Sequence, residues 1–350
     1  MCAGRLGLVP ETPDIGVGLH HGVRRPVACP MTRARRPSPP DPEEFIVNNE
    51  MAENAAEKSG LRLSCADYSF RPLQPWESAM QAIAGLGLDG VDLCLIGGSS
   101  HLNVEDLMAD PDAMVRRIND TVAATGVAIA DIALLADPDL QTLSNFGYMA
   151  ANNPDPELRE AADAMFEAVL DVAARVGARS LTVLPGVLWP HETKEESFQR
   201  TVTVLTEMAL KAQARGVKLC VEPHVGSVIQ DPEDALRLCQ EAAPCGLTLD
   251  YSHFISRGVE QDALDELTKH AVYVHARAAT TGRLQVPLER SEIDFPRWMD
   301  VLTGNGYEGY VGFEYVNIEG DFQLDDIDTL TETAKMRDLL RGHWATVDAG

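Results

Sequence analysis

The strongest constraint on the fold is an alternation of two kinds of segment, which repeats eight times from Leu61 onward. Short runs rich in apolar and β-branched residues are each followed by a longer amphipathic segment, a pattern typical of strands that alternate with helices. The expected strands cover residues 61–66, 90–95, 127–134, 180–184, 217–222, 247–250, 272–275 and 310–314. The expected helices cover residues 75–85, 104–125, 157–176, 193–215, 232–242, 261–268, 295–304 and 325–342.

Eight such units in roughly 285 residues fit an α/β fold, a single (β/α)8 TIM barrel. The alternative is an open, doubly wound sheet, which normally carries a glycine-rich phosphate turn after its first strand. The residues at that place, Ser64-Cys65-Ala66-Asp67, do not form GxGxxG, and no GxxxxGK(S/T) loop occurs in the chain. The sequence therefore favours the closed barrel.

The first fifty residues have a different composition from the rest. They are rich in proline, contain six arginines and six acidic residues, and show neither helical nor strand periodicity. They lack the apolar stretch of a secretory signal, and Glu11 and Asp14 count against a targeting peptide. We therefore expect residues 1–57 to be a disordered or non-native N-terminal extension, with Met51 an alternative start, and residues 58–345 to be the barrel.

The charge excludes some partners. The 350 residues include 29 Lys and Arg against 54 Asp and Glu, a net charge of −25 that belongs entirely to the part after residue 50. A phosphate backbone is bound by clustered Lys and Arg, so we expect no nucleic-acid partner. No run approaches about 18 apolar residues, so we expect no membrane-spanning helix. A small carbohydrate, a metal cation, a second copy of the chain or a small partner subunit all remain compatible with this charge.

The cysteines indicate a reducing compartment. Their number, seven, is odd, and no CxxC pair occurs, which argues against a zinc ribbon and against a redox motif. Three of them lie inside apolar runs, where a thiol behaves as a small hydrophobic group. We expect a reduced, cytoplasmic protein.

Four of the expected strands end in residues that bind metals. The last four strands lead directly to Glu222, Asp250, His275 and Glu314. Taken singly, each has a structural explanation: a carboxylate paired with an arginine, a helix cap or a hydrogen-bonded core histidine. In a barrel, however, these strand ends converge at the C-terminal face, where active sites lie. Three carboxylates and one imidazole suit a divalent ion such as Mn²⁺, Mg²⁺, Co²⁺ or Zn²⁺.

Three further side chains are expected beside this cluster. His253 lies three residues after Asp250, where it either binds substrate or orients that carboxylate. His224, two residues after Glu222, either contacts substrate or lines the rim. Arg277 lies two residues after His275, on the same side of the strand. It meets either an anionic group or one of the carboxylates.

The loop after the fourth strand adds two candidates. It reads Pro185-Gly-Val-Leu-Trp-Pro-His191, so that Trp189 is placed to stack on a sugar and His191 to act as an acid or base. The alternative is a rim loop held by an anchoring aromatic side chain. Asp67-Tyr68 and His101 are weaker candidates on the rim.

These segments resemble the xylose-isomerase-like barrel superfamily, specifically its sugar phosphate isomerase/epimerase group. The resemblance covers about residues 60–342 and is carried by Val221-Glu-Pro223, Leu249-Asp-Tyr-Ser-His253, Val274-His-Ala-Arg277 and Phe313-Glu-Tyr315, with Ser291-Glu-Ile-Asp-Phe295 and Trp298. It implies that Glu222, Asp250, His275 and Glu314 are metal ligands, with Mn²⁺ the favoured ion. It also implies that Glu222 and Glu314 exchange the substrate proton on opposite faces and that His253 contacts substrate.

The chain departs from the epimerases of that group in two places. It has Ala276-Arg277 where they often have Gly-Glu, and it lacks their Gly-x-Gly loop before Ile293. The segment from His275 to Gln285 looks more like the catalytic subunits of C-glycoside deglycosidases, which implies substrate contacts for Gln285.

Two reactions follow from this constellation. The first is isomerisation or epimerisation of a keto-sugar or related polyol, by proton abstraction next to a carbonyl through a metal-stabilised enediolate. The alternative is a metal-dependent lyase or dehydratase acting on a keto-inositol or a 3-keto glycoside. A DNA-repair endonuclease on the same fold is disfavoured by the negative charge, and a non-catalytic barrel by the complete ligand set.

Overall fold

The computed structural model describes residues 60–96, 100–135, 150–318 and 323–348. The expected N-terminal extension, residues 1–57, lies outside this part of the chain.

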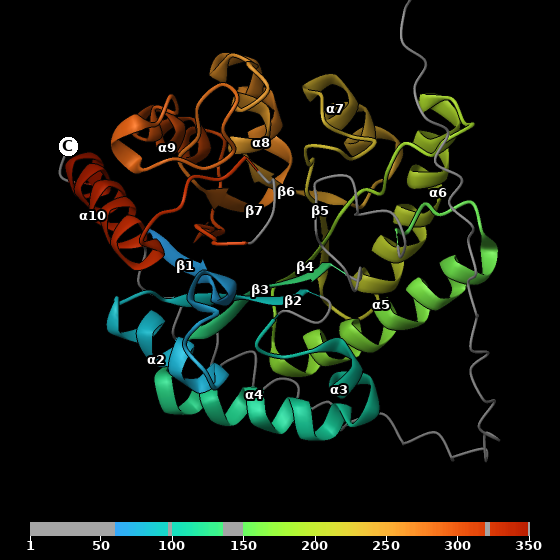
Figure 1. Ribbon diagram of the computed structural model, residues 1–350, viewed down its shortest axis with the longest axis horizontal. Coiled ribbons are helices and arrows are strands. Elements are labelled where there is room, and N and C mark those ends of the chain that lie inside the picture. Colours follow the sequence, from blue (N-terminus) through green and yellow to red (C-terminus); the bar gives the residue numbers. More distant parts are fainter. Residues whose placement is uncertain (1–59, 97–99, 136–149, 319–322, 349–350) are drawn as a thin grey trace, which may run out of the picture. The chain divides into compact units, whose positions relative to one another are not determined.

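Eight parallel strands close into a barrel. Each strand pairs with the next along the chain, and the last pairs with the first. Figure 1 shows the ring of strands with the helices around it. The prediction of a closed barrel rather than an open sheet is therefore confirmed. The strands are β1 (Arg62–Ala66), β2 (Gly90–Ile96), β3 (Ala128–Leu135), β4 (Ser180–Val183), β5 (Lys218–Val221), β6 (Gly246–Asp250), β7 (Ala271–Ala276) and β8 (Tyr310–Phe313).

The helices that follow the strands cover the outside of the barrel (Figure 1). Short helical turns follow β1 and β6, and a third precedes α9. The α-helices are α2 (Trp76–Gly85), α3 (Val104–Ala109), α4 (Pro111–Thr125), α5 (Pro156–Val176), α6 (Lys194–Gln213), α7 (Pro232–Glu241), α8 (Ser252–Ile255), α9 (Phe295–Gly304) and α10 (Thr329–Asp348). The 3-10 helices are η1 (Asp67–Phe70), η2 (Gln261–His270) and η3 (Leu288–Arg290).

Capping residues set several helix ends. Asp155 caps α5 with its side chain, and Pro156 occupies the first turn, where its missing N–H costs nothing. In α6, Thr193 and Glu196 form a reciprocal capping box. Gly177 ends α5 in a left-handed conformation, with φ 72°. These local signals explain why the expected boundaries agree closely with the observed ones.

Some expected helices were wrong in detail. The single helix expected at 104–125 is two helices, because Asp110 caps a second one whose first residue is Pro111. The segment expected as a helix at 261–268 is the 3-10 helix η2. The last helix begins at Thr329 rather than near 325. The short helix α8 was not predicted, since four residues are too few to show a period.

The core has two layers of different character. Apolar faces of the helices pack against the outside of the strands, whereas the inside of the barrel holds several buried polar groups. Ser64 Oγ lies 2.8 Å from Tyr273 Oη, and Thr182 Oγ1 lies 2.6 Å from Thr248 Oγ1. These pairs satisfy buried hydroxyls on strands that are separated by one other strand in the barrel. No helix in the described part of the chain is both long and apolar enough to cross a membrane.

Candidate metal centre

Four side chains from successive strands meet at the mouth of the barrel. Glu222 follows β5, Asp250 ends β6, His275 is the penultimate residue of β7, and Glu314 follows β8. One potential ligand atom from each lies within 4.8 Å of the others. His275 Nδ1 is 2.9 Å from Glu222 Oε1 and 3.4 Å from Glu314 Oε2. The convergence expected from the strand ends is therefore present in the structure, while the roles of the residues remain predictions.

The packing of β7 and β8 fixes the imidazole of His275. The ring of Tyr273 lies edge-on to it, with centroids 5.3 Å apart. Gly312, its register partner on β8, leaves room for both rings, since a Cβ there would lie 2.2 Å from Tyr273 Oη and 3.3 Å from His275 Cδ2. A glycine in a strand interior commonly marks such a close approach.

The guanidinium of Arg277 lies against two carboxylates of the cluster. Its Nη2 donates to Asp250 Oδ2 at 2.6 Å and lies 3.1 Å from Glu314 Oε2, and its Nε donates to Ser252 Oγ at 3.1 Å. Ser252 also donates its N–H and its Oγ–H to Asp250. The sequence left two partners open for Arg277, an anionic group or one of the carboxylates, and the structure favours the carboxylates.

The pKa values of Glu222 and Glu314 are shifted in opposite directions. Burial raises the pKa of Glu314 to about 7. Burial also acts to raise the pKa of Glu222, but the hydrogen bond and charge of His275 outweigh it and lower that pKa below its usual range. Paired carboxyl groups whose pKa values are pushed apart in this way suit the roles of acid and base.

Two histidines lie beside Glu222. His253 Nε2 is 3.8 Å from Glu222 Oε1 and 3.2 Å from Arg277 Nη2. The ring centroids of His224 and His253 lie 4.0 Å apart, with the ring planes tilted by 43°. Both rings contact the backbone of Val225: its carbonyl accepts from His224 Nδ1, and its N–H points to His253 Nδ1. Burial lowers the pKa of both histidines, so both imidazoles are neutral at pH 7.

The cluster fits a divalent cation. Its donor set of three carboxylates and one imidazole matches the oxygen-rich sites of Mn²⁺ and Mg²⁺ and is accepted by Co²⁺ and Zn²⁺. Glu314 Oε2 is buried and, although it lies 3.1 Å from Arg277 Nη2, accepts no hydrogen bond in the described part of the chain. A buried oxygen of this kind needs an explanation, and a bound ion supplies one.

The loop after β4 is held by a residue far away in the sequence. The buried side chain of Asn152 accepts hydrogen bonds from Trp189 Nε1 at 3.0 Å and from the N–H of Val187 at 3.1 Å. The indole N–H of Trp189 is therefore used in the fold, as expected for an anchored rim loop. His191 is exposed, with φ 73°, and contributes to none of the hydrogen bonds or ion pairs of the cluster.

The structure places Gln285 differently from its expected role. Its amide N–H groups donate to the carbonyls of Val316 and Asp325, and its Oε1 accepts from the N–H of Val316. Gln285 is fully buried and has no N–H group left for a substrate. Gln285 joins the loops after β7 and β8. The expected contact with substrate was wrong because its partners, Val316 and Asp325, lie far from it in the sequence.

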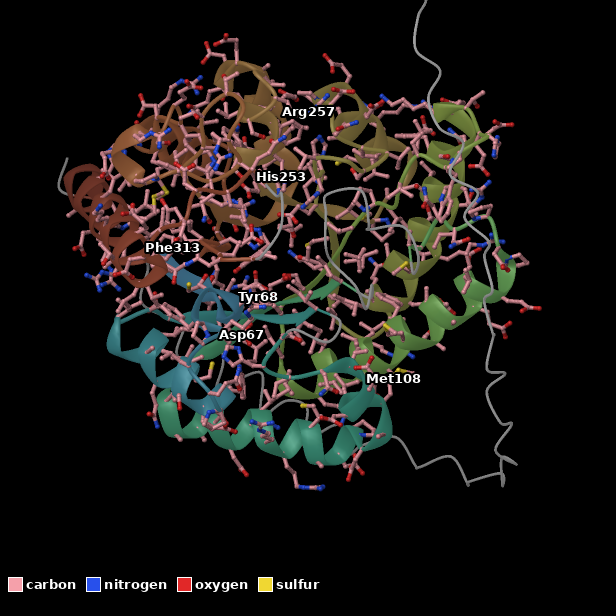
Figure 2. All side chains as sticks on the ribbon, viewed as in Figure 1. Asp67, Tyr68, Met108, His253, Arg257 and Phe313 are labelled. Carbon is pink, nitrogen blue, oxygen red and sulfur yellow. The ribbon has the colours of Figure 1, made fainter. Side chains whose placement is uncertain are left out.

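One residue in contact with the cluster has no counterpart among the strand-end candidates. Asp92, in the middle of β2, accepts a hydrogen bond from His275 Nε2 at 2.8 Å. Its only signal in the sequence is that it is a lone charge in an apolar run. The weaker rim candidates Asp67 and Tyr68 lie on η1, and Figure 2 shows them below His253 in the view.

The fold and the cluster together define a class: a (β/α)8 barrel with a candidate metal centre at the C-terminal ends of its strands. Sequence comparison identifies the family within that class. The chain belongs to the xylose isomerase-like TIM barrel family, whose sequence profile matches residues 80–341. No curated protein sequence matches the chain.

Several solved structures have the same fold. The 3-keto-D-glucoside 4-epimerase YcjR of E. coli has a TM-score of 0.60 and 16% identity, covering 81% of this chain and 99% of its own. The D-psicose 3-epimerase of Clostridium cellulolyticum H10, solved with D-tagatose, has a TM-score of 0.62 and 15% identity, over 81% and 99%. A family protein from Mycobacterium smegmatis in complex with magnesium has a TM-score of 0.62 and 14% identity, over 82% and 97%.

Proposed function

We propose that the protein is a divalent-metal-dependent isomerase or epimerase of a keto-sugar or related polyol. The observation that carries this proposal is the meeting of Glu222, Asp250, His275 and Glu314 at the barrel mouth. The family supports it, since two of the similar structures are named as sugar epimerases. The metal we propose is Mn²⁺. One similar structure is described with magnesium and another with zinc, and the donor set accepts both of these ions as well as Mn²⁺.

The ligands of the proposed metal are the four residues of the cluster. A divalent cation held there supplies Lewis acidity, which stabilises negative charge on an oxygen next to the carbon that loses its proton. Arg277 reduces the repulsion among the carboxylates through its contacts with Asp250 and Glu314. The buried setting strengthens each of these interactions compared with water.

The proton transfers are assigned to Glu222 and Glu314. Glu222 has the lowered pKa and is ionised at pH 7, so it removes the proton beside the carbonyl. We assign Glu314 to returning a proton to the substrate; in the metal-free cluster its pKa is raised to about 7. His253 is neutral and lies close to Glu222, where we assign it to contact with the substrate.

The same arrangement supports elimination as the alternative reaction. If Glu314 protonates a leaving oxygen at the β-position rather than a carbon, the product is that of a lyase or dehydratase on a keto-inositol or 3-keto glycoside. The raised pKa of Glu314 favours this equally, because it keeps an acid available near neutral pH.

We place the protein in the cytoplasm, in line with the free thiols of its five described cysteines.

The test of this proposal is turnover of keto-sugars in D₂O. Protein loaded with Mn²⁺ is incubated with D-tagatose, D-psicose and a 3-keto-D-glucoside, and products are followed by NMR and mass spectrometry. An isomer that carries solvent deuterium beside the carbonyl is the expected result. Loss of water or aglycone assigns the lyase alternative. Absence of exchange with all three sugars, compared with protein treated with a chelator, contradicts the proposal.

A further inference from the structure

Asp92 contacts the candidate metal centre from the far side of the imidazole. It lies in the middle of β2, with 1% of its surface exposed, whereas the four residues of the cluster come from β5 to β8. Its Oδ2 is 2.8 Å from His275 Nε2. In the described part of the chain, its other oxygen, Oδ1, has no hydrogen-bond partner. Within the described residues, the buried carboxylate of Asp92 therefore makes one hydrogen bond, and its partner is His275.

A buried carboxylate is costly to keep unless its partner requires it. Asp92 is not needed to satisfy a neighbouring backbone group, and Asn or Ser would serve a purely structural hydrogen bond at lower cost. Its position on β2 places Oδ2 2.8 Å from Nε2 of the imidazole that packs against Tyr273 and Gly312. This arrangement indicates that Asp92 acts through the imidazole of His275.

The two nitrogens of His275 face different surroundings. Nε2 faces Asp92 Oδ2 at 2.8 Å, where the carboxylate oxygen is placed to accept a hydrogen bond from it. Nδ1 faces Glu222 at 2.9 Å and Glu314 at 3.4 Å, on the side where the ligand atoms converge. By the same reasoning Nδ1–H donates to Glu222 in the metal-free protein. A cation in the cluster would take the place of that hydrogen, whereas the hydrogen on Nε2 stays with Asp92.

We propose that Asp92 is a positioning residue that holds His275 in its Nε2–H form and so presents the Nδ1 lone pair to a divalent cation. This inference rests on the proposed function, because it assigns the support of the same metal site. A ligating histidine commonly donates its other N–H to a carboxylate, which fixes the ring and raises the basicity of the ligating nitrogen. Here that carboxylate comes from a strand that carries none of the four ligands.

The structure provides a matched control in Asp131. It is the register neighbour of Asp92 on β3, is also fully buried, and accepts a hydrogen bond from Ser180 Oγ rather than from His275. Asp92→Asn and Asp131→Asn each replace one interior carboxylate by an amide of the same shape. A general effect of altering the interior of the barrel would appear in both variants.

The first experiment measures metal affinity. Metal-free wild type, D92N and D131N are titrated with Mn²⁺ and with Co²⁺ in a calorimeter, with circular dichroism to check folding. We expect D92N to bind each ion about 10- to 100-fold more weakly than wild type, as is typical when the partner of a ligating histidine is lost. D131N should bind within about threefold of wild type, because it leaves the hydrogen bond between Asp92 and His275 in place. Equal affinity in D92N and D131N overturns the inference.

The second experiment needs no variant and decides the matter if D92N does not fold. The nitrogen chemical shifts of His275 are measured in wild-type protein loaded with Zn²⁺, which is diamagnetic. A protonated Nε2 and a metal-bound Nδ1 are expected, whereas a protonated Nδ1 overturns the inference. Absence of any cation binding by wild type would defeat the proposed function itself. Binding and turnover by wild type with unchanged D92N affinity would defeat only the role of Asp92.

Discussion

Glu222→Gln is expected to lower kcat of the metal-loaded protein by about 10²- to 10⁴-fold, the usual contribution of a general acid or base. Glutamine keeps the shape of the side chain and an oxygen that can accept from His275, but it cannot take a proton. Glu314→Gln should lose activity to a similar extent, because the amide has no proton to return to the substrate. The measurement is steady-state turnover of the sugar that exchanges in D₂O, with metal content determined for each variant.

A suitable control for these two variants is Glu266→Gln. Glu266 is an exposed carboxylate of η2 that pairs with Lys269 and lies outside the cluster. It should retain wild-type kcat and, like the other two, unfold cooperatively in urea. Full activity in Glu222→Gln or in Glu314→Gln would show that the proton transfers are assigned to the wrong residues.

Arg277→Met is expected to destabilise the metal-free protein by about 3 to 5 kcal/mol, the cost typical of removing one partner from a buried ion pair. Methionine has a similar length but no charge, so Asp250 and Glu314 would face each other uncompensated. A divalent cation bound to these carboxylates supplies positive charge in place of the guanidinium. The loss of stability should therefore be smaller when the protein is loaded with Mn²⁺.

Urea unfolding of wild type and Arg277→Met, each with a chelator and with saturating Mn²⁺, measures this difference. Arg257→Met is the comparison, since Arg257 pairs with Asp231 at 2.9 Å near the surface, where an ion pair contributes at most about 1 kcal/mol. Its effect should not depend on the metal. An equal loss for Arg277→Met in both conditions would contradict the view that Arg277 and the metal neutralise the same carboxylates.

The sequence was most informative where local pattern and topology act together. Period and turn signals predict the strands, and the parallel closed topology then requires their C-terminal ends to share one rim. Strand pattern and topology are therefore enough to predict the convergence of Glu222, Asp250, His275 and Glu314. The break at Asp110-Pro111 was missed because α3 and α4 share one amphipathic pattern, although the cap followed by proline was its local signal.

Contacts between distant segments could not be predicted in the same way. Asn152 holds Trp189, and Val316 and Asp325 hold Gln285, although neither pairing has a pattern in the sequence. The direction of a loop side chain depends on such partners rather than on its own segment. Asp92 was missed for a related reason: it lies within a strand, so only the closure of the barrel brings it to His275.

Elemental analysis of protein purified without chelators tests the central claim most directly. If Glu222, Asp250, His275 and Glu314 form a metal centre, wild-type protein should contain about one divalent ion per chain, and Mn²⁺ is the ion that we propose. Asp250→Asn should contain much less and should regain little on dialysis against Mn²⁺. A wild-type protein that holds no divalent ion, and binds none when Mn²⁺, Mg²⁺, Co²⁺ or Zn²⁺ is added, would contradict the account.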